Sequence, residues 1–185
     1  MTYFTADLHL GHDNIISFCN RPFKNIEEMD KAIIDNWNSK VTEKDEVWIL
    51  GDFSYRSVKN VENYLQKLKG KKHLIIGNHD RTWMEKIDLD KYFFSIDKIS
   101  YTCVDSKNII MCHYPIMEWS GYYHDYYMVY GHIHNSVGQP YWNLIIENKF
   151  MLNAGVDINN FFPVTFDELI ENNQSFKTKH KSIIN

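Results

Sequence analysis

The chain has 185 residues, of which 44% are apolar and 15% aromatic, and its formal net charge is -4. This length predicts one domain over residues 1–185 with a substantial core. The charge argues against a general nucleic-acid or membrane-surface binder, because such proteins usually carry a basic excess. Three cysteines without a C-x-x-C spacing argue against a disulfide framework and favour a reducing compartment. With no leader pattern and no apolar run of membrane-spanning length, we expect a cytoplasmic protein.

The first eighty residues alternate between strand and helix patterns. Apolar runs at 2–6, 47–50 and 73–76 predict strands, and apolar residues at helical spacing in 26–37 and 58–68 predict amphipathic helices. A short helix is expected after Gly11, with Phe18 on its apolar side. The alternation is typical of parallel βαβ units, whose ligand sites lie at the carboxyl ends of the strands. Asp7, Asp52 and Asn78 all follow such strand ends.

After Asp90 the pattern changes to shorter strands with fewer helices. Strands are expected at 92–96 and 99–104, which could pair with each other, and at 108–112, 126–130 and 150–153. A capping box from Thr165 to Glu168 predicts a short helix that ends at Glu171. The tail after Asn172 is the one segment expected to lack a fold.

Polar side chains with metal-binding or proton-transfer chemistry follow five of these strands. Positions i and i+2 of an extended segment face the same side, which would bring Asp7 toward His9 and His132 toward His134. Mixed oxygen and imidazole donors suit Mn, Fe or Zn better than Mg alone. Six or seven ligands suit two ions with a bridging carboxylate. We favour Asp52 for that bridge, because it follows the middle strand of the three.

The order of these motifs resembles the calcineurin-like metallophosphoesterase superfamily. The motifs span residues 7 to 134 and read Asp7-x-His9, Gly51-Asp52, Gly77-Asn78-His79-Asp80, His113 and Gly131-His132-x-His134. The resemblance implies an α/β fold, a four-layer α/β/β/α sandwich of two mixed sheets flanked by helices. It also implies two divalent metal ions, for which we favour Mn over Fe, Zn or Ni.

The same resemblance implies a role for each motif residue. Asp52 and His79 would be catalytic, with a hydroxide that bridges the ions as nucleophile and His79 stabilising the transition state or protonating the leaving oxygen. One ion would be held by Asp7, His9, Asp52 and His134, and the other by Asp52, Asn78, His113 and His132. By their side-chain chemistry, the candidate phosphate contacts are Asn78, His12 at a helix start, the ammonium group of Lys24, and the guanidinium groups of Arg21, Arg56 and Arg81.

One position departs from the pattern of the superfamily. Many relatives extend the second motif to Gly-Asp-x-x-Asp-Arg, whose later aspartate orients the imidazole that corresponds to His79. In this chain Tyr55 stands in place of that aspartate, and Arg56 is kept. Either Asp80 or another group orients His79, or the proton-transfer role of His79 is weaker here.

We therefore expect a metal-dependent phosphoric ester hydrolase. Its substrate would be a small phosphorylated molecule such as a nucleotide or a cyclic nucleotide, bound as a mono- or diester. The enzymatic alternative is a nuclease, for which nucleic acid would be a substrate only. The alternative from another class is a metal-binding scaffold without activity. No membrane partner is expected, and the sequence indicates neither the physiological substrate nor the oligomeric state.

Overall fold

The computed structural model describes residues 1–55 and 58–181, and within them the strands form two four-stranded sheets. The first sheet contains β1 (Thr2–Thr5), β2 (Glu46–Ile49), β3 (Lys71–Ile75) and β4 (Phe93–Asp97) in that order, each pair parallel. The second contains β5 (Ile99–Val104), β6 (Lys107–Cys112), β7 (Tyr127–Tyr130) and β8 (Met151–Asn153). Strand β5 runs antiparallel to β6, whereas β6, β7 and β8 are parallel.

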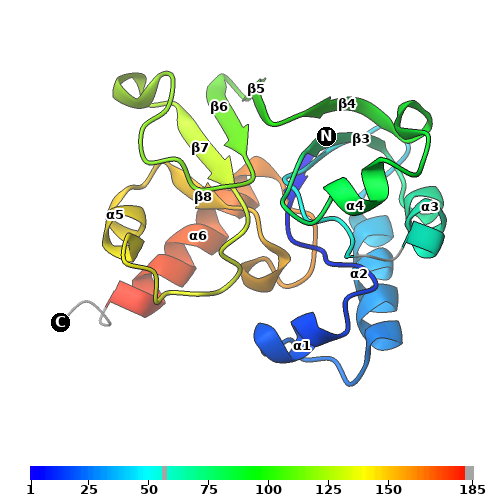
Figure 1. Ribbon diagram of the computed structural model, residues 1–185. Coiled ribbons are helices and arrows are strands. Elements are labelled where there is room, and N and C mark those ends of the chain that lie inside the picture. Colours follow the sequence, from blue (N-terminus) through cyan, green and yellow to red (C-terminus); the bar gives the residue numbers. More distant parts are fainter. Residues whose placement is uncertain (56–57, 182–185) are drawn as a thin grey trace.

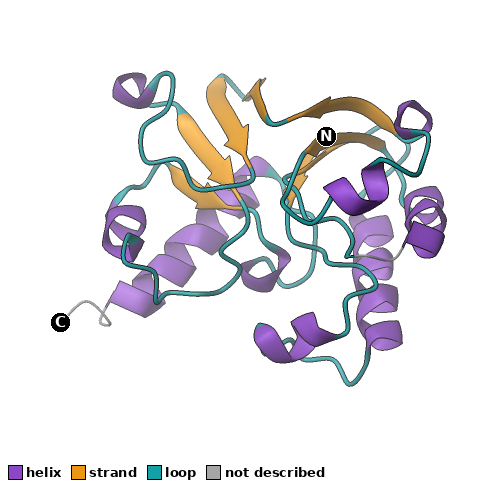
Figure 2. Cartoon of the chain, viewed as in Figure 1, coloured by secondary structure: helices purple, strands orange, loops and turns teal. Residues whose placement is uncertain are grey.

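Helices cover the outer face of each sheet (Figures 1 and 2). The first sheet is covered by α2 (Ile26–Lys40) and α3 (Val58–Lys67), and the second by α5 (Trp142–Glu147). Helix α6 (Phe166–His180) lies along β8 and β1, and its first turns add Phe166 and Leu169 to the core between the sheets. The short helices α1 (Asn14–Phe18) and α4 (Arg81–Met84) follow β1 and β3, and three 3-10 turns are η1 (Leu89–Lys91), η2 (Tyr122–His124) and η3 (Val156–Ile158). The expected four-layer α/β/β/α sandwich is confirmed, with the second sheet mixed and the first parallel.

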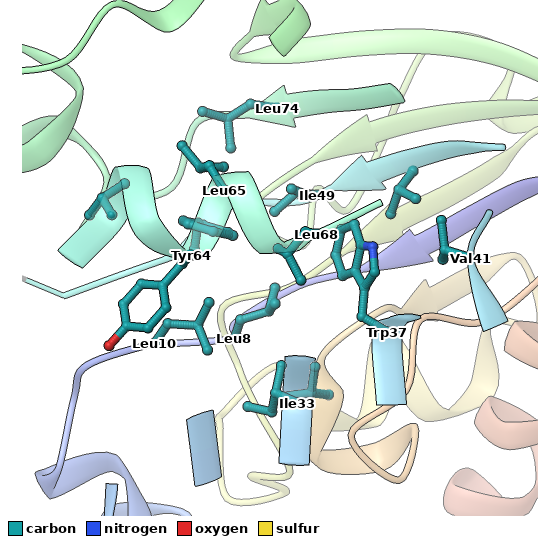
Figure 3. Close-up of a cluster of buried hydrophobic side chains, with 14 of the residues drawn as sticks. Leu8, Leu10, Ile33, Trp37, Val41, Ile49, Tyr64, Leu65, Leu68 and Leu74 are labelled. Atoms are coloured by element: carbon teal, nitrogen blue, oxygen red, sulfur yellow. The ribbon is translucent and has the colours of Figure 1, made fainter. Parts of the chain in front are cut away.

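Alternation along the strands separates the layers. In β1, Tyr3 faces the core shared with α2 and α3, while Phe4 faces the core between the two sheets. Figure 3 shows the first of these cores, where Trp37 of α2 and Leu65 of α3 pack near Ile49. A third core joins the outer face of the second sheet to α5. Burying each such side chain contributes roughly 1.5–3 kcal/mol, so both sheets are held rigidly beneath the loops at their ends.

Helix α2 begins where the sequence provides a cap. The side chain of Asn25 accepts a hydrogen bond from the Glu28 backbone N–H at 2.9 Å, and acidic residues occupy the first turn. The predicted capping box of α6 is also present, because Thr165 and Glu168 bond each other's backbone N–H groups.

Three expectations about these elements are wrong. The strands at 92–96 and 99–104 do not pair: β4 joins β3 and β5 joins β6, so the chain passes from one sheet to the other at Lys98. Helix α6 continues past Asn172 to His180, because Asn173 and Lys177 bond backbone carbonyls at β8. Phe18, expected on the apolar side of α1, is 73% exposed at the last position of that helix, where its ring lies beside His12.

No helix among the described residues combines the length and the apolar character that crossing a membrane requires.

Candidate metal centre

The predicted ligands follow strand ends that meet at one edge of the sandwich. Because β1, β2 and β3 are parallel, as are β6 and β7, the loops after these strands leave from the same side of their sheets. Five of the seven predicted ligands have a left-handed backbone, which is uncommon for residues other than glycine. They are Asp7 (φ 57°), His9 (φ 53°), Asp52 (φ 53°), His132 (φ 69°) and His134 (φ 51°).

This left-handed backbone corrects the expectation that Asp7 and His9 converge along an extended segment. The chain turns at each of these residues, and the turns are fixed by hydrogen bonds between loops. The backbone N–H of Asp7 donates to the Gly51 carbonyl and that of His9 donates to the Asp52 carbonyl, both at 3.0 Å. Such strained positions persist where surrounding contacts over-determine them, and they cluster at functional sites.

One ligand group consists of Asp7, His9 and His134, whose ligand atoms all lie within 4.8 Å of one another. His9 Nε2 is buried and has no hydrogen-bond partner in the described part of the chain. A buried ring nitrogen without a hydrogen-bond partner is suited to bind a metal ion. Burial raises the pKa of Asp7 to about 6, although the charges of His134 and His113 oppose this. Burial also places the pKa of His9 well below its usual value, so this imidazole is neutral, as a metal ligand must be.

The second ligand group consists of Asp52, His113 and His132, again within 4.8 Å. His113 Nδ1 lies 2.8 Å from the Leu50 carbonyl oxygen, which can only accept, so Nδ1 donates and Nε2 is the nitrogen that can bind an ion. Nε2 faces Asn78 Oδ1 at 2.9 Å. Two acceptors at this distance need a proton or a metal cation between them. Burial alone would lower the pKa of His113, but its hydrogen bond to Asp52 and nearby carboxylate charges raise it to about 9.

Asp52 lies between the two groups. Its Oδ1 accepts a hydrogen bond from the His79 backbone N–H at 2.8 Å. Its Oδ2 lies 3.6 Å from His9 Nε2 and 3.5 Å from His113 Nε2. Ions bound roughly 2.0–2.2 Å from oxygen and nitrogen ligands require ligand atoms separated by distances of this order. The residues present therefore fit two ions that share Asp52.

Asp80 supports the Asp52 loop and does not orient His79. Its Oδ2 accepts from the backbone N–H groups of Asp52 (2.9 Å) and Gly77 (2.8 Å). Its Oδ1 accepts from the backbone N–H of Phe53 (2.9 Å) and from Trp83 Nε1 (3.1 Å). A carboxylate has about four acceptor positions, and all of them are occupied.

Aromatic rings surround His79 instead. The Tyr55 ring meets the His79 ring edge to face, with centroids 5.0 Å apart and planes at 74°. Tyr55 also stacks on His12, with centroids 3.8 Å apart and planes at 19°. His12 Nδ1 in turn lies 3.2 Å from His9 Nδ1. The residue that replaces the aspartate of the superfamily motif therefore contacts His79 directly.

A cleft of about 680 Å³ opens beside the two ligand groups. His12, Tyr55 and His79 line it together with His9, His132 and His134, and so do Phe18, Asn135, Gln139 and Tyr141.

The predicted phosphate contacts are placed differently from one another. His12 lines the cleft and Asn78 lies beside His113. Arg81 is exposed, pairs with Glu85 at 3.3 Å and is not brought to the cleft. Arg56 lies outside the described residues. Arg21 is buried in an ion pair, so the expectation that it contacts phosphate is wrong.

The partner of Arg21 is Asp157, a residue that the sequence motifs do not include. Asp157 Oδ2 lies 2.9 Å from His134 Nδ1. Burial alone would raise the pKa of Asp157, but the hydrogen bond from His134 and the charge of Arg21 hold it below its usual value. Asp157 lies in η3, which follows β8, so its place after the last strand was its one signal in the sequence.

Comparison with known proteins places this geometry in a family. An uncharacterized protein of Methanocaldococcus jannaschii is 33% identical over 171 residues, which cover 91% of this chain and 89% of that protein. A solved structure of a protein of unknown function from Aquifex aeolicus is 25% identical, with a TM-score of 0.70 and coverage of 92% of this chain and 98% of the other. The nuclease MPE of Pseudomonas putida is less similar, at 20% identity and a TM-score of 0.48, with coverage of 72% and 61%. A model of the calcineurin-like phosphoesterase family matches residues 2–181, and the chain belongs to that family.

Proposed function

We propose that the chain is a two-metal phosphoesterase that hydrolyses mono- or diesters of a small substrate, such as a nucleotide or a cyclic nucleotide. The family implies phosphoester hydrolysis and generally binds divalent metal ions. The observation on which the proposal rests is the position of Asp52 Oδ2, at 3.6 Å from one group's His9 Nε2 and 3.5 Å from the other group's His113 Nε2. A carboxylate oxygen between two sets of nitrogen ligands is what a pair of ions requires.

Each ion would have four protein ligands in this proposal. Oxygen and imidazole donors without thiolates favour Mn among the divalent metals considered. Bound ions would supply Lewis acidity toward the phosphoryl oxygens and the attacking water. The ligand sets are Asp7, His9, Asp52 and His134 for one ion, and Asp52, Asn78, His113 and His132 for the other.

His79 is proposed as the proton donor to the leaving oxygen. It lines the cleft next to both ligand groups, and its backbone N–H is bonded to Asp52 Oδ1 at 2.8 Å. The adjacent rings of Tyr55 and His9 restrict the orientation of the imidazole. A positioned imidazole of this kind typically contributes about 100-fold or more to the rate when the leaving group is poor.

The cleft supports a small substrate. Its volume of about 680 Å³ is in the range of sites for small molecules. Among the residues that the structure describes, its lining contains neither lysine nor arginine. A long nucleic acid would require such cations along its backbone path. The exposed Phe18 ring and the buried Gln139 Oε1, which has no hydrogen-bond partner among the described residues, suit a planar, polar leaving group such as a nucleoside.

The test is hydrolysis by Mn²⁺-loaded protein. Turnover of p-nitrophenyl phosphate or bis-p-nitrophenyl phosphate is expected, followed by turnover of individual nucleotides or cyclic nucleotides in a panel. Asp52→Asn should abolish turnover and lower bound Mn²⁺, because it removes the shared charge. Preferred cleavage of single-stranded DNA or RNA would favour the nuclease alternative. Bound Mn²⁺ with no hydrolysis of any ester would favour the scaffold alternative. The proposal is refuted if the protein neither binds Mn²⁺ nor hydrolyses any of the esters.

A further inference from the structure

Arg21 and Asp157 form a buried ion pair directly behind the first ligand group. Arg21 Nε donates to Asp157 Oδ1 at 2.8 Å, and Arg21 Nη2 donates to Asp157 Oδ2 at 3.0 Å. The two side chains are 0% and 1% exposed. A two-point contact between a guanidinium and a carboxylate fixes the orientation of both planes. The pair therefore connects the segment after α1 with the turn η3 after β8.

The carboxylate of Asp157 sets the tautomer of His134. His134 Nδ1 lies 2.9 Å from Asp157 Oδ2. An ionised carboxylate can only accept a hydrogen bond, so Nδ1 keeps its proton, and the ring loses the proton on Nε2 when it binds an ion. Histidines that bind metals commonly have such a partner, which orients the ring and increases its basicity.

Arg21 also holds the loop that contains the other ligands of this group. Its Nη2 donates to the Asp7 carbonyl at 2.7 Å, and its Nη1 donates to the Leu8 carbonyl at 3.0 Å. Asp7 and His9, on either side of Leu8, both have left-handed backbones, which cost of order 1–3 kcal/mol each unless surrounding contacts maintain them. The buried guanidinium provides two of those contacts.

The same atoms argue against an additional ion at this place. Ligand atoms of Cys19, His134 and Asp157 lie within 4.8 Å of one another, a spacing that a metal could bridge. However, Arg21 contacts both oxygens of Asp157, and its permanent charge would repel a cation there. The cluster is therefore better explained as support for His134 than as a separate metal site.

We infer that Asp157 and Arg21 are positioning residues for one half of the metal centre: Asp157 orients His134 so that Nε2 faces the ion, and Arg21 ties Asp157 to the backbone of Asp7. This inference rests on the proposed function, since it assumes that His134 binds an ion. Neither residue contacts the substrate in this scheme, so both act through metal affinity.

The test is Mn²⁺ binding to metal-free protein, measured by isothermal titration calorimetry and by metal content after dialysis. In Asp157→Asn a single acceptor oxygen faces three N–H donors, so the orientation of His134 is lost. We expect the affinity for one Mn²⁺ to fall about 10–100-fold. The matched control is Asp45→Asn. Asp45 is also a buried, paired carboxylate, bonded to Thr42 and the Met1 amino group, but it precedes β2 at the opposite end of the sheet. This control should bind Mn²⁺ like the wild type.

A second variant separates charge from geometry. Arg21→Lys keeps the positive charge, but one ammonium group cannot reach both Asp157 oxygens and two carbonyls at once. Its Mn²⁺ affinity should also fall, and it serves as the test if Asp157→Asn does not fold. Nitrogen-15 NMR of labelled histidines gives a third readout. In wild type loaded with diamagnetic Zn²⁺ in place of Mn²⁺, His134 should carry a proton on Nδ1 and bind the ion through Nε2.

The positioning role of Asp157 and Arg21 and the proposed function are refuted by different results. Wild-type Mn²⁺ affinity in folded Asp157→Asn or Arg21→Lys, or an unprotonated His134 Nδ1, would overturn the positioning role while leaving the proposed function intact. Failure of the wild type itself to bind Mn²⁺ would refute the proposed function.

Discussion

Replacing Asp80 by asparagine should destabilise the loop that contains Asp52. The Asp80 carboxylate accepts hydrogen bonds from the backbone N–H groups of Asp52, Phe53 and Gly77 and from the indole of Trp83. Burial and the charge of Asp52 raise the pKa of Asp80 to about 6, against the opposing effect of the backbone hydrogen bonds. The carboxylate is therefore mostly ionised at pH 7.5, where all four bonds involve a charged acceptor.

The size of the effect follows from these four bonds. Asparagine has one acceptor oxygen, so two N–H donors lose their acceptor and face an amide N–H₂ group instead. Hydrogen bonds to a charged group contribute about 1.5–3 kcal/mol each, which gives a loss of about 3–6 kcal/mol. In a chain of 185 residues, each kcal/mol shifts the unfolding temperature by about 2–4 °C. The metal-free Asp80→Asn variant should therefore unfold at least about 6 °C lower than the wild type.

Two assays distinguish this supporting role from orientation of His79. Circular dichroism at pH 7.5 measures the unfolding temperature, and calorimetry measures Mn²⁺ affinity, which should fall because the loop that holds Asp52 loosens. At saturating Mn²⁺, the ratio of turnover on p-nitrophenyl phosphate to turnover on phenyl phosphate should stay as in the wild type. An unchanged unfolding temperature together with a selective loss on phenyl phosphate, the poorer leaving group, would refute the reasoning and assign Asp80 to His79.

Three further predictions concern the rings, the protons and the close approach of backbone at the site. Tyr55→Ala removes the ring that packs against the proposed proton donor, so turnover of phenyl phosphate should fall about ten-fold more than that of p-nitrophenyl phosphate. Equal losses on the two esters would contradict this role. Burial alone would lower the pKa values of His113 and His134, but neighbouring carboxylates raise them to about 9 and about 10 in the metal-free protein. Both imidazoles are then charged at pH 7, and their contribution to stability is fully present below about pH 6.5 and lost as the pH rises through about 9 and 10. Mn²⁺ binding should accordingly release about two protons and strengthen as the pH rises. Calorimetry in buffers of different ionisation enthalpy measures the number of protons released, and binding without proton release would contradict these charges. Gly77→Ala would place a Cβ 2.3 Å from a carboxylate oxygen of the shared ligand and should abolish Mn²⁺ binding, whereas Gly138→Ala, with nothing within 4 Å of the added Cβ, should bind like the wild type; intact binding by Gly77→Ala would show that the loop can move aside.

Much of the site could be predicted because its residues obey a rule of topology. Apolar runs and helical spacing indicated parallel βαβ units, and parallel strands bring their carboxyl ends to one edge. Asp7, Asp52 and Asn78 were therefore expected together before any contact was known, and the structure brings Asp52 between His9 and His113. The pattern of apolar residues indicates where each strand ends, and the strand ends are enough to locate these ligands.

The same pattern cannot identify the partner of a strand. Alternation in 92–96 and 99–104 is equally consistent with mutual pairing and with membership of two different sheets, and the structure has the second arrangement. Helix α6 was underestimated because its second half has a polar sequence, and its stability comes from the bonds of Asn173 and Lys177 to distant carbonyls. Tertiary contacts override local propensity in both cases.

The supporting residues of the site were the hardest to predict, because each depends on contacts between distant segments. Arg21 had the chemistry of a phosphate anchor, and only the fold shows that Asp157, 136 positions away, binds its guanidinium. Asp80 follows His79 directly in the sequence, yet its carboxylate faces the Asp52 loop. The contact between Tyr55 and His79 likewise requires the folded positions of two loops.

The central claim is that two ions share Asp52, and anomalous diffraction from crystals grown with Mn²⁺ tests it most directly. The account predicts two manganese peaks, one among Asp7, His9 and His134 and the other among Asn78, His113 and His132, with the Asp52 carboxylate between them. Occupancy of one group alone with Asp52 unligated, or a peak at Cys19 and Asp157 instead, would contradict it.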